Sequence, residues 1–210
     1  MSSSVIKSGV TLAAIAAICT ALVAITWQLT HERIAENQQL MLEMSLAPAL
    51  AGLEFEGRIS ESMLLIPPPH ELPGQDTAIV YRVFADQQPV AALFAVTARD
   101  GYAGPIRILV GISYAGEITG VQILEHRETP GLGDRIEARR SDWVYQFDGH
   151  SLADPPLSGW ALQRDGGQFD QLTGASVTPR AVIKAIRETL VYFAAHREEL
   201  FTAPASEAAE

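Results

Sequence analysis

The sequence predicts an α+β fold, with a single N-terminal transmembrane helix followed by an antiparallel-sheet domain on which helices pack. Residues 8–30 carry no charged side chain and match the length of a membrane-spanning helix. Short apolar runs rich in β-branched and aromatic residues, separated by turn residues, indicate four antiparallel strands. They lie at residues 78–84, 90–96, 106–112 and 118–124. Apolar residues at helical spacing over 179–200 predict an amphipathic helix, with Val182, Ile183, Ile186, Leu190 and Phe193 on one stripe.

The stretch at residues 8–30 has two interpretations, a retained membrane anchor and a cleaved signal peptide. Its apolar part is long, no small-x-small cleavage site precedes a polar start, and Trp27 lies where an interfacial aromatic residue is expected. These features favour the retained anchor. Lys7 is the only charged residue before the span, so the charge bias barely decides which side faces the cytoplasm.

The remaining chain divides by composition into a connecting segment, a folded domain and a tail. Residues 31–76 are expected to form a juxtamembrane helix, ending near Leu50, and a proline-rich loop over 64–76. Residues 77–200 form the folded domain, in which Tyr114–Glu117 turns a hairpin and 136–147 is helical. Residues 201–210 are expected to be a flexible tail.

Charge and cysteine content exclude several classes of protein. The 210 residues carry a net charge of -10 without a Lys/Arg cluster, which argues against nucleic-acid binding. Hydrophobic residues make up 48%, enough for a packed core. Cys19 is the only cysteine, so the chain has neither an intrachain disulfide nor a cysteine-ligated iron–sulfur or zinc site.

The segment 170–179 is the first candidate site. Its small residues allow close backbone approach to a ligand, and a helix is predicted directly after it. Thr178 is the expected N-cap and Pro179 the first helical residue, while Arg180 either contacts a phosphate or faces solvent. The start of a helix favours a phosphate group. On physical grounds alone, a capped turn without a ligand remains the simpler interpretation.

Within that segment, the pattern Asp170-x-x-Thr173-Gly174-Ala175-Ser176 resembles the flavinylation motif of the FMN-binding domain family. The resemblance implies that FMN is covalently attached through a phosphoester on Ser176, by a flavin transferase that uses FAD. The family has threonine at this position, where this chain has serine, which keeps the hydroxyl nucleophile. Thr178 is the nearest alternative acceptor and ranks lower, because it is off the motif and is expected to cap the helix.

A second segment, His126 to Ile136, resembles the His-x-Glu-Thr-Pro-Gly-Leu-Gly loop of the same family. Its glycines permit close approach to a flat ring. The resemblance implies that residues of this loop contribute to FMN binding, namely His126, Glu128, Thr129, Gly131 and Leu132. Tyr102 is a further candidate near the ring. Each of these candidates also has a simpler structural interpretation. For His126 it is a structural histidine held by hydrogen bonds, and for Glu128 it is a solvated charge. Trp143 and Tyr145 are expected to anchor the core rather than to stack on the flavin.

Both motifs, the anchor and the chain length together resemble the RnfG family, the G subunits of Rnf electron-transport complexes. The resemblance implies a single-pass protein of the bacterial inner membrane whose domain 77–200 lies in the periplasm and whose residues 1–7 are cytoplasmic. It implies electron transfer within a complex that also contains the A, B, C, D and E subunits, next to the FMN-bearing D subunit. That complex couples ferredoxin and NAD chemistry to ion translocation, and the isolated chain would catalyse no complete reaction. The C subunit of the sodium-translocating NADH:quinone reductase is the runner-up.

Two hypotheses from other classes remain. A serine hydrolase would pair Ser176 with a histidine such as His126, although the second glycine of a nucleophile elbow is missing. A non-redox membrane-anchored assembly or binding module would carry no flavin at all.

Overall fold

The computed structural model describes residues 12–13, 16–17, 19–20, 47–50 and 62–203. The chain divides into two compact units, Met1–Leu42 and Glu43–Glu210. Most of the membrane helix expected at 8–30 and of the juxtamembrane helix lies outside the described residues, although the three short described pieces of the first are helical. Within the described residues, no helix combines the length and the apolar character needed to cross a membrane.

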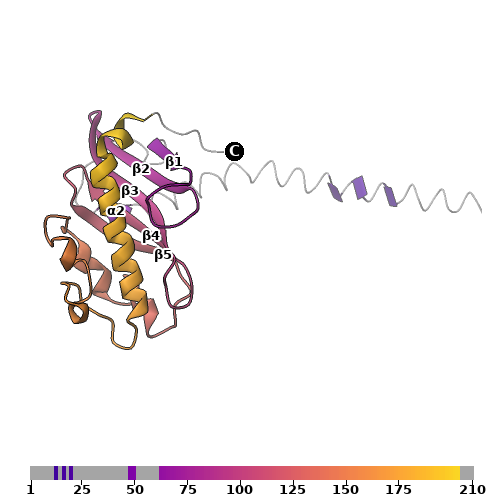
Figure 1. Ribbon diagram of the computed structural model, residues 1–210. Coiled ribbons are helices and arrows are strands. Elements are labelled where there is room, and N and C mark those ends of the chain that lie inside the picture. The colour runs from indigo at the N-terminus through magenta and orange to yellow at the C-terminus, as the bar shows by residue number, and fades with distance from the viewer. Residues whose placement is uncertain (1–11, 14–15, 18, 21–46, 51–61, 204–210) are drawn as a thin grey trace, which may run out of the picture. The chain divides into compact units, whose positions relative to one another are not determined.

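The second unit is built on a five-stranded antiparallel sheet in the order β1-β2-β3-β4-β5 (Figure 1), so each strand pairs with its neighbour along the chain. The strands are β1 (Met63–Ile66), β2 (Ala78–Ala85), β3 (Gln88–Ala98), β4 (Ile106–Ser113) and β5 (Ile118–Glu125). The four strands expected from the sequence are confirmed, including the hairpin between β4 and β5. β1 was missed, because its four residues stand next to a proline run and pair only with β2.

One face of the sheet is covered by the long helix α2 (Val177–Thr202), which crosses it diagonally in Figure 1. Side chains that face α2 form cross-strand rows, such as Val80, Phe94, Val110 and Val121. The predicted apolar stripe of the helix is confirmed, since all five of its residues are buried. Burial of each such side chain stabilises the fold by roughly 1.5–3 kcal/mol.

The opposite face of the sheet carries a second buried set of residues. The short 3-10 helix η1 (Ala47–Leu50) lies here, and the Thr119 hydroxyl donates a hydrogen bond to the Ala49 carbonyl oxygen. Gly111 makes room for this contact, because a Cβ there would lie 2.2 Å from the same oxygen.

The end of α2 extends past the boundary expected for the flexible tail. Phe201 packs edge-to-face against Phe84 and Tyr114, and Arg82 donates hydrogen bonds to the carbonyl oxygens of Leu200 and Ala203. Residues 201–203 therefore belong to the folded domain, since these contacts hold them against β2. The rest of the expected tail lies outside the described residues.

The segment between β5 and α2 contains no α-helix, so the helix expected over 136–147 is wrong. It holds four 3-10 helices: η3 (Gly133–Ile136), η4 (Asp142–Phe147), η5 (Leu157–Gly159) and η6 (Gln163–Asp165). Extended backbone at Ser141 separates the first two, and its hydroxyl accepts a hydrogen bond from the Trp143 amide. Trp143 anchors an aromatic cluster as expected, with Phe147, Trp160 and Phe169. Tyr145 does not join this cluster, because its side chain points outward and is 53% exposed.

Candidate functional site

The two motif segments meet at the start of α2. Thr178, the second residue of the helix, donates a hydrogen bond from its hydroxyl to Glu128 Oε2 (2.5 Å). Leu132 lies so close to Gly174 that a Cβ at position 174 would stand 2.9 Å from Leu132 Cδ2. Segments about 40 residues apart in the chain therefore form one surface, as expected if both serve the same ligand.

Glu128 is buried, at 4% exposure, so the alternative that it is a solvated charge is wrong. Its Oε1 accepts a hydrogen bond from the Ala103 amide (3.0 Å), and its Oε2 accepts the one from Thr178. The carboxyl group thus joins the 101–104 loop, the 126–136 loop and α2. Gly101 and Gly133 make room for it, because a Cβ at either position would stand within 2.9 Å of a carboxyl oxygen.

Ser176 directly precedes α2 and occupies the N-cap position. Its hydroxyl does not cap the helix but accepts a hydrogen bond from Arg164 Nη1 (2.8 Å). The prediction that Thr178 is the N-cap is wrong, because the helix begins one residue before it and its hydroxyl is engaged with buried Glu128. Pro179 is accordingly the third helical residue rather than the first. The Ser176 side chain makes no capping hydrogen bond to α2, so among the described residues the first amides of the helix lack a side-chain cap.

Arg164 was not singled out from the sequence. It belongs to η6, twelve residues before Ser176, in a stretch without a recognisable pattern. Arg180, which was considered as a phosphate ligand, instead pairs with Asp165 through two hydrogen bonds of 2.6 and 2.9 Å. The Arg180 guanidinium holds the pKa of the Asp165 carboxyl below its usual value. This pair fixes η6 against α2, and with it the turn that carries Arg164.

The residues from Asp170 to Ala175 form a tight turn that leads into Ser176. Asp170 opens it: its carboxylate accepts from Gln163 Nε2 (2.7 Å), and its carbonyl accepts from Trp143 Nε1 (2.7 Å). The Ala175 amide donates to the Leu172 carbonyl (3.1 Å), with Gly174 at φ +83°. This positive φ at the third turn position explains the glycine. Thr173, at the tip, is exposed.

The 126–136 loop is held by hydrogen bonds within itself. His126 Nδ1 accepts from the Glu128 amide (3.0 Å), and its Nε2 is 2.7 Å from Glu137 Oε1. The Thr129 carbonyl accepts from three successive amides, and Gly131 turns the chain at φ +78°. His126 therefore has the contacts of a structural histidine. Leu132, within this loop, and Tyr102, in the loop that follows β3, remain exposed, at 42% and 72%.

Glu137 makes the loop sensitive to acid. A hydrogen bond from Arg139 lowers the pKa of the Glu137 carboxyl to about 2, and the hydrogen bond with His126 acts in the same direction, against the effect of burial. A carboxyl group with a lowered folded-state pKa contributes stability that is complete above its unfolded pKa of about 4.3 and is lost as the pH falls towards the folded value.

We therefore expect the free energy of unfolding to fall between about pH 5 and pH 2, and to fall less steeply in a Glu137→Gln variant. Urea unfolding of the full-length chain across this pH range measures the difference. Glu198→Gln is the matched control and should keep the wild-type slope, because this exposed side chain on α2 forms no ion pair with any described residue. Equal slopes in wild type and Glu137→Gln would contradict the assignment.

Family models match both halves of the chain. An FMN-binding domain model matches residues 101–191, which span β4, β5, both motif segments and most of α2. A model of the RnfG N-terminal region matches residues 1–48.

Full-length relatives and one solved structure agree with these matches. The G subunit of the ion-translocating oxidoreductase complex of Escherichia coli O157:H7 is 41% identical over 199 residues, 95% of this chain and 96% of that protein. That of Shewanella amazonensis is 39% identical over 204 residues, 97% and 95% of the two chains. The crystal structure of Shewanella oneidensis NqrC shares the fold, with a TM-score of 0.56 and 19% identity over 80% of this chain and all of that one. The chain therefore belongs to the family of G subunits of ion-translocating oxidoreductase complexes, and its folded unit contains an FMN-binding domain.

Proposed function

We propose that this subunit carries FMN covalently on Ser176 and passes electrons between its partners in the complex. The observation that supports this most directly is the environment of the Ser176 hydroxyl. It lies at an uncapped helix start, 2.8 Å from the Arg164 guanidinium, in a turn whose Gly174 leaves no room for a side chain.

The residues present fit a phosphate ester at this position. Arg164 supplies a fixed positive charge at the ester oxygen, and the first amides of α2 supply donors and the positive end of the helix dipole. Leu132, exposed beside Gly174, and the glycine turn at 131 offer an apolar, open surface for a flat ring. Asp134, in the same loop, pairs with Arg140 through Oδ2 (3.5 Å), whereas its buried Oδ1 has no hydrogen-bond partner among the described residues.

The bound flavin would supply the electron-transfer chemistry, and the protein would retain, orient and partly shield it. The same hydroxyl does not fit a serine hydrolase, because its partner is a guanidinium, whereas His126 is engaged with Glu137 and the Glu128 amide. A base next to the nucleophile is what hydrolysis requires.

A single N-terminal helix would anchor the domain in the bacterial inner membrane, with the domain on the periplasmic side, where a covalent bond prevents loss of the flavin. A flavin transferase would attach FMN from FAD. The A, B, C, D and E subunits would be the partners of this chain, with the D subunit adjacent. The match of the RnfG N-terminal region to residues 1–48 supports an N-terminal segment of that type.

The intact mass of the chain tests the covalent bond. Chain purified from its native membranes should be heavier than the sequence by one FMN less one water, and should keep flavin fluorescence after denaturing electrophoresis. Chain of unmodified mass from that source would instead support the non-redox assembly module.

Arg164→Ala should slow flavin attachment by about 10- to 100-fold, the effect of losing one charge-assisted hydrogen bond of roughly 1.5–3 kcal/mol at the acceptor oxygen. The appearance of covalent fluorescence, with purified transferase, FAD and full-length chain, gives the rate. Arg187→Gln is the control, because it removes an arginine of α2 that lies well after the start of the helix. A wild-type rate in Arg164→Ala would show that the arginine plays no part.

A further inference from the structure

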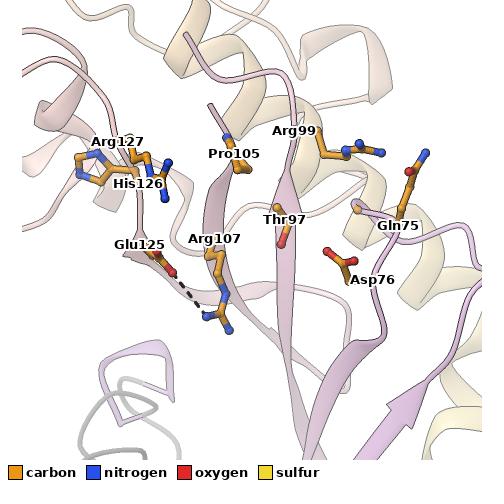
Figure 2. Close-up of a pocket in the computed structure, with 10 residues that line it drawn as sticks. Gln75, Asp76, Thr97, Arg99, Pro105, Arg107, Glu125, His126 and Arg127 are labelled. Atoms are coloured by element: carbon orange, nitrogen blue, oxygen red, sulfur yellow. Dashed lines mark ion pairs between the residues drawn. The ribbon is translucent and has the colours of Figure 1, made fainter. Parts of the chain in front are cut away.

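An open cleft with a volume of about 410 Å³ lies at the end of the sheet where β3 and β5 finish and β4 begins (Figure 2). Arg107 and Glu125 pair across β4 and β5, and Thr97 pairs with Arg107 across β3 and β4. Glu125 pairs with Arg107 through a register shift between Arg107 and Ile108. Thr97 and Arg107 alternate along β3 and β4 with buried residues of the core that faces α2, such as Val96 and Ile108, so they lie on the opposite face of the sheet. The cleft is therefore separate from the Ser176 turn.

Three arginines line this cleft, although the chain as a whole carries a net charge of -10. Arg99 follows β3, Arg107 lies on β4 and Arg127 follows β5, so they stand side by side across three neighbouring strands. In Figure 2 Arg99 and Arg127 lie on either side of Arg107. Three arginines gathered in one cleft of an acidic chain favour a negatively charged partner.

Little of this charge is neutralised within the described part of the chain. Arg107 forms a long ion pair with Glu125 (3.7 Å), and both side chains are more than half exposed, so this pair contributes little. Arg99 and Arg127 form no ion pair with any described residue. Both guanidinium groups remain available for bidentate contacts with carboxylates.

We infer that this cleft docks an acidic segment of a partner subunit, whose carboxylates pair with Arg99 and Arg127. Because the cleft is open and its arginines are spread over three strands, it is better suited to bind a protein segment than a single small anion. Arginine is enriched in protein interfaces, and this family works as one subunit of a complex. Asp76 and Glu125 also line the cleft, but the three arginines outnumber these two carboxylates, so the lining still favours an acidic segment.

The position of the cleft gives such a contact a functional consequence. Arg127 directly precedes Glu128, whose carboxyl group holds the start of α2 through Thr178. A partner bound to Arg127 would therefore lie next to the loop that borders the Ser176 turn. The docking surface depends on membership in the complex and not on how the flavin is attached.

The test uses full-length chain assembled in its complex, with the variant Arg99→Glu/Arg127→Glu. We expect the variant to dissociate from the solubilised complex at lower salt than wild type, with retention reduced about tenfold at near-physiological salt. Arg187→Glu, on the α2 side of the sheet, makes the same type of charge change and should behave like wild type. Unchanged salt dependence in the double variant, or an equal loss in Arg187→Glu, would overturn the inference.

A photo-crosslinking residue at exposed Gln75, on the wall of the cleft, identifies the occupant. We expect a crosslink to an Asp/Glu-rich segment of another subunit, and its loss in Arg99→Glu/Arg127→Glu. A crosslink to phospholipid, or none to any subunit, would show that the surface serves another purpose.

Discussion

Ser176→Ala is expected to abolish covalent flavin entirely, because it removes the one hydroxyl oxygen that lies at the uncapped start of α2 and beside Arg164 in the described part of the chain. The substitution should leave the fold unchanged, since that hydroxyl does not cap the helix and its side chain is only half-buried. Intact mass, measured after coexpression with the flavin transferase, should equal that of the unmodified chain.

Two neighbouring hydroxyls provide matched controls for that result. Thr173→Ala removes an exposed hydroxyl from the same turn, and Thr178→Val removes the buried one while keeping the side-chain shape. Both variants should still gain one FMN less one water. Ser176→Thr, which restores the residue of the family motif, should gain it as well. A flavin retained in Ser176→Ala but lost in Thr178→Val would move the acceptor to Thr178.

The strands and the long helix could be predicted because their signals are local. Alternation and turn residues marked β2 to β5, and a 3.6-residue apolar stripe marked α2. β1 could not be recognised, because four residues beside a proline run become a strand only through pairing with β2. The helix predicted over 136–147 was wrong for a related reason. The aromatic residues of this segment are fixed by a cluster with Trp160 and Phe169, which local periodicity does not encode.

The candidate site was only partly accessible to sequence reasoning. The two motifs predicted which segments form the site, but not that Glu128 is buried, that Thr178 donates a hydrogen bond to it, or that Arg164 reaches Ser176. The two hydrogen bonds join residues 50 and 12 positions apart, which no local pattern reveals. The helix cap was misassigned because Thr-Pro is a strong local start signal, and the tertiary contact with Glu128 overrides it.

Glu128→Leu is expected to destabilise the domain by about 3 kcal/mol, lowering the melting temperature by roughly 10 °C. The variant leaves the Ala103 amide and the Thr178 hydroxyl without their acceptor, and each unsatisfied group costs about 1–3 kcal/mol. Glu128→Gln is the matched control. Its amide oxygen can accept from Ala103 and its amide nitrogen can donate to the Thr178 hydroxyl, which also serves as an acceptor, so the loss should stay below about 1 kcal/mol.

The same variants separate a purely structural role for Glu128 from one that positions the flavin site. Combining Glu128→Leu with Thr178→Val in a double-mutant cycle should give a smaller loss of stability than the sum of the single changes, because both remove one shared hydrogen bond. If the contact also sets the start of α2 for attachment, flavin attachment to folded Glu128→Leu chain, measured below its melting temperature, should be slower than to Glu128→Gln. Additive losses with equal attachment rates would mean that Glu128 merely fills space between the two loops. Coupled losses with slower attachment would make the Glu128–Thr178 contact the link between the 126–136 loop and Ser176.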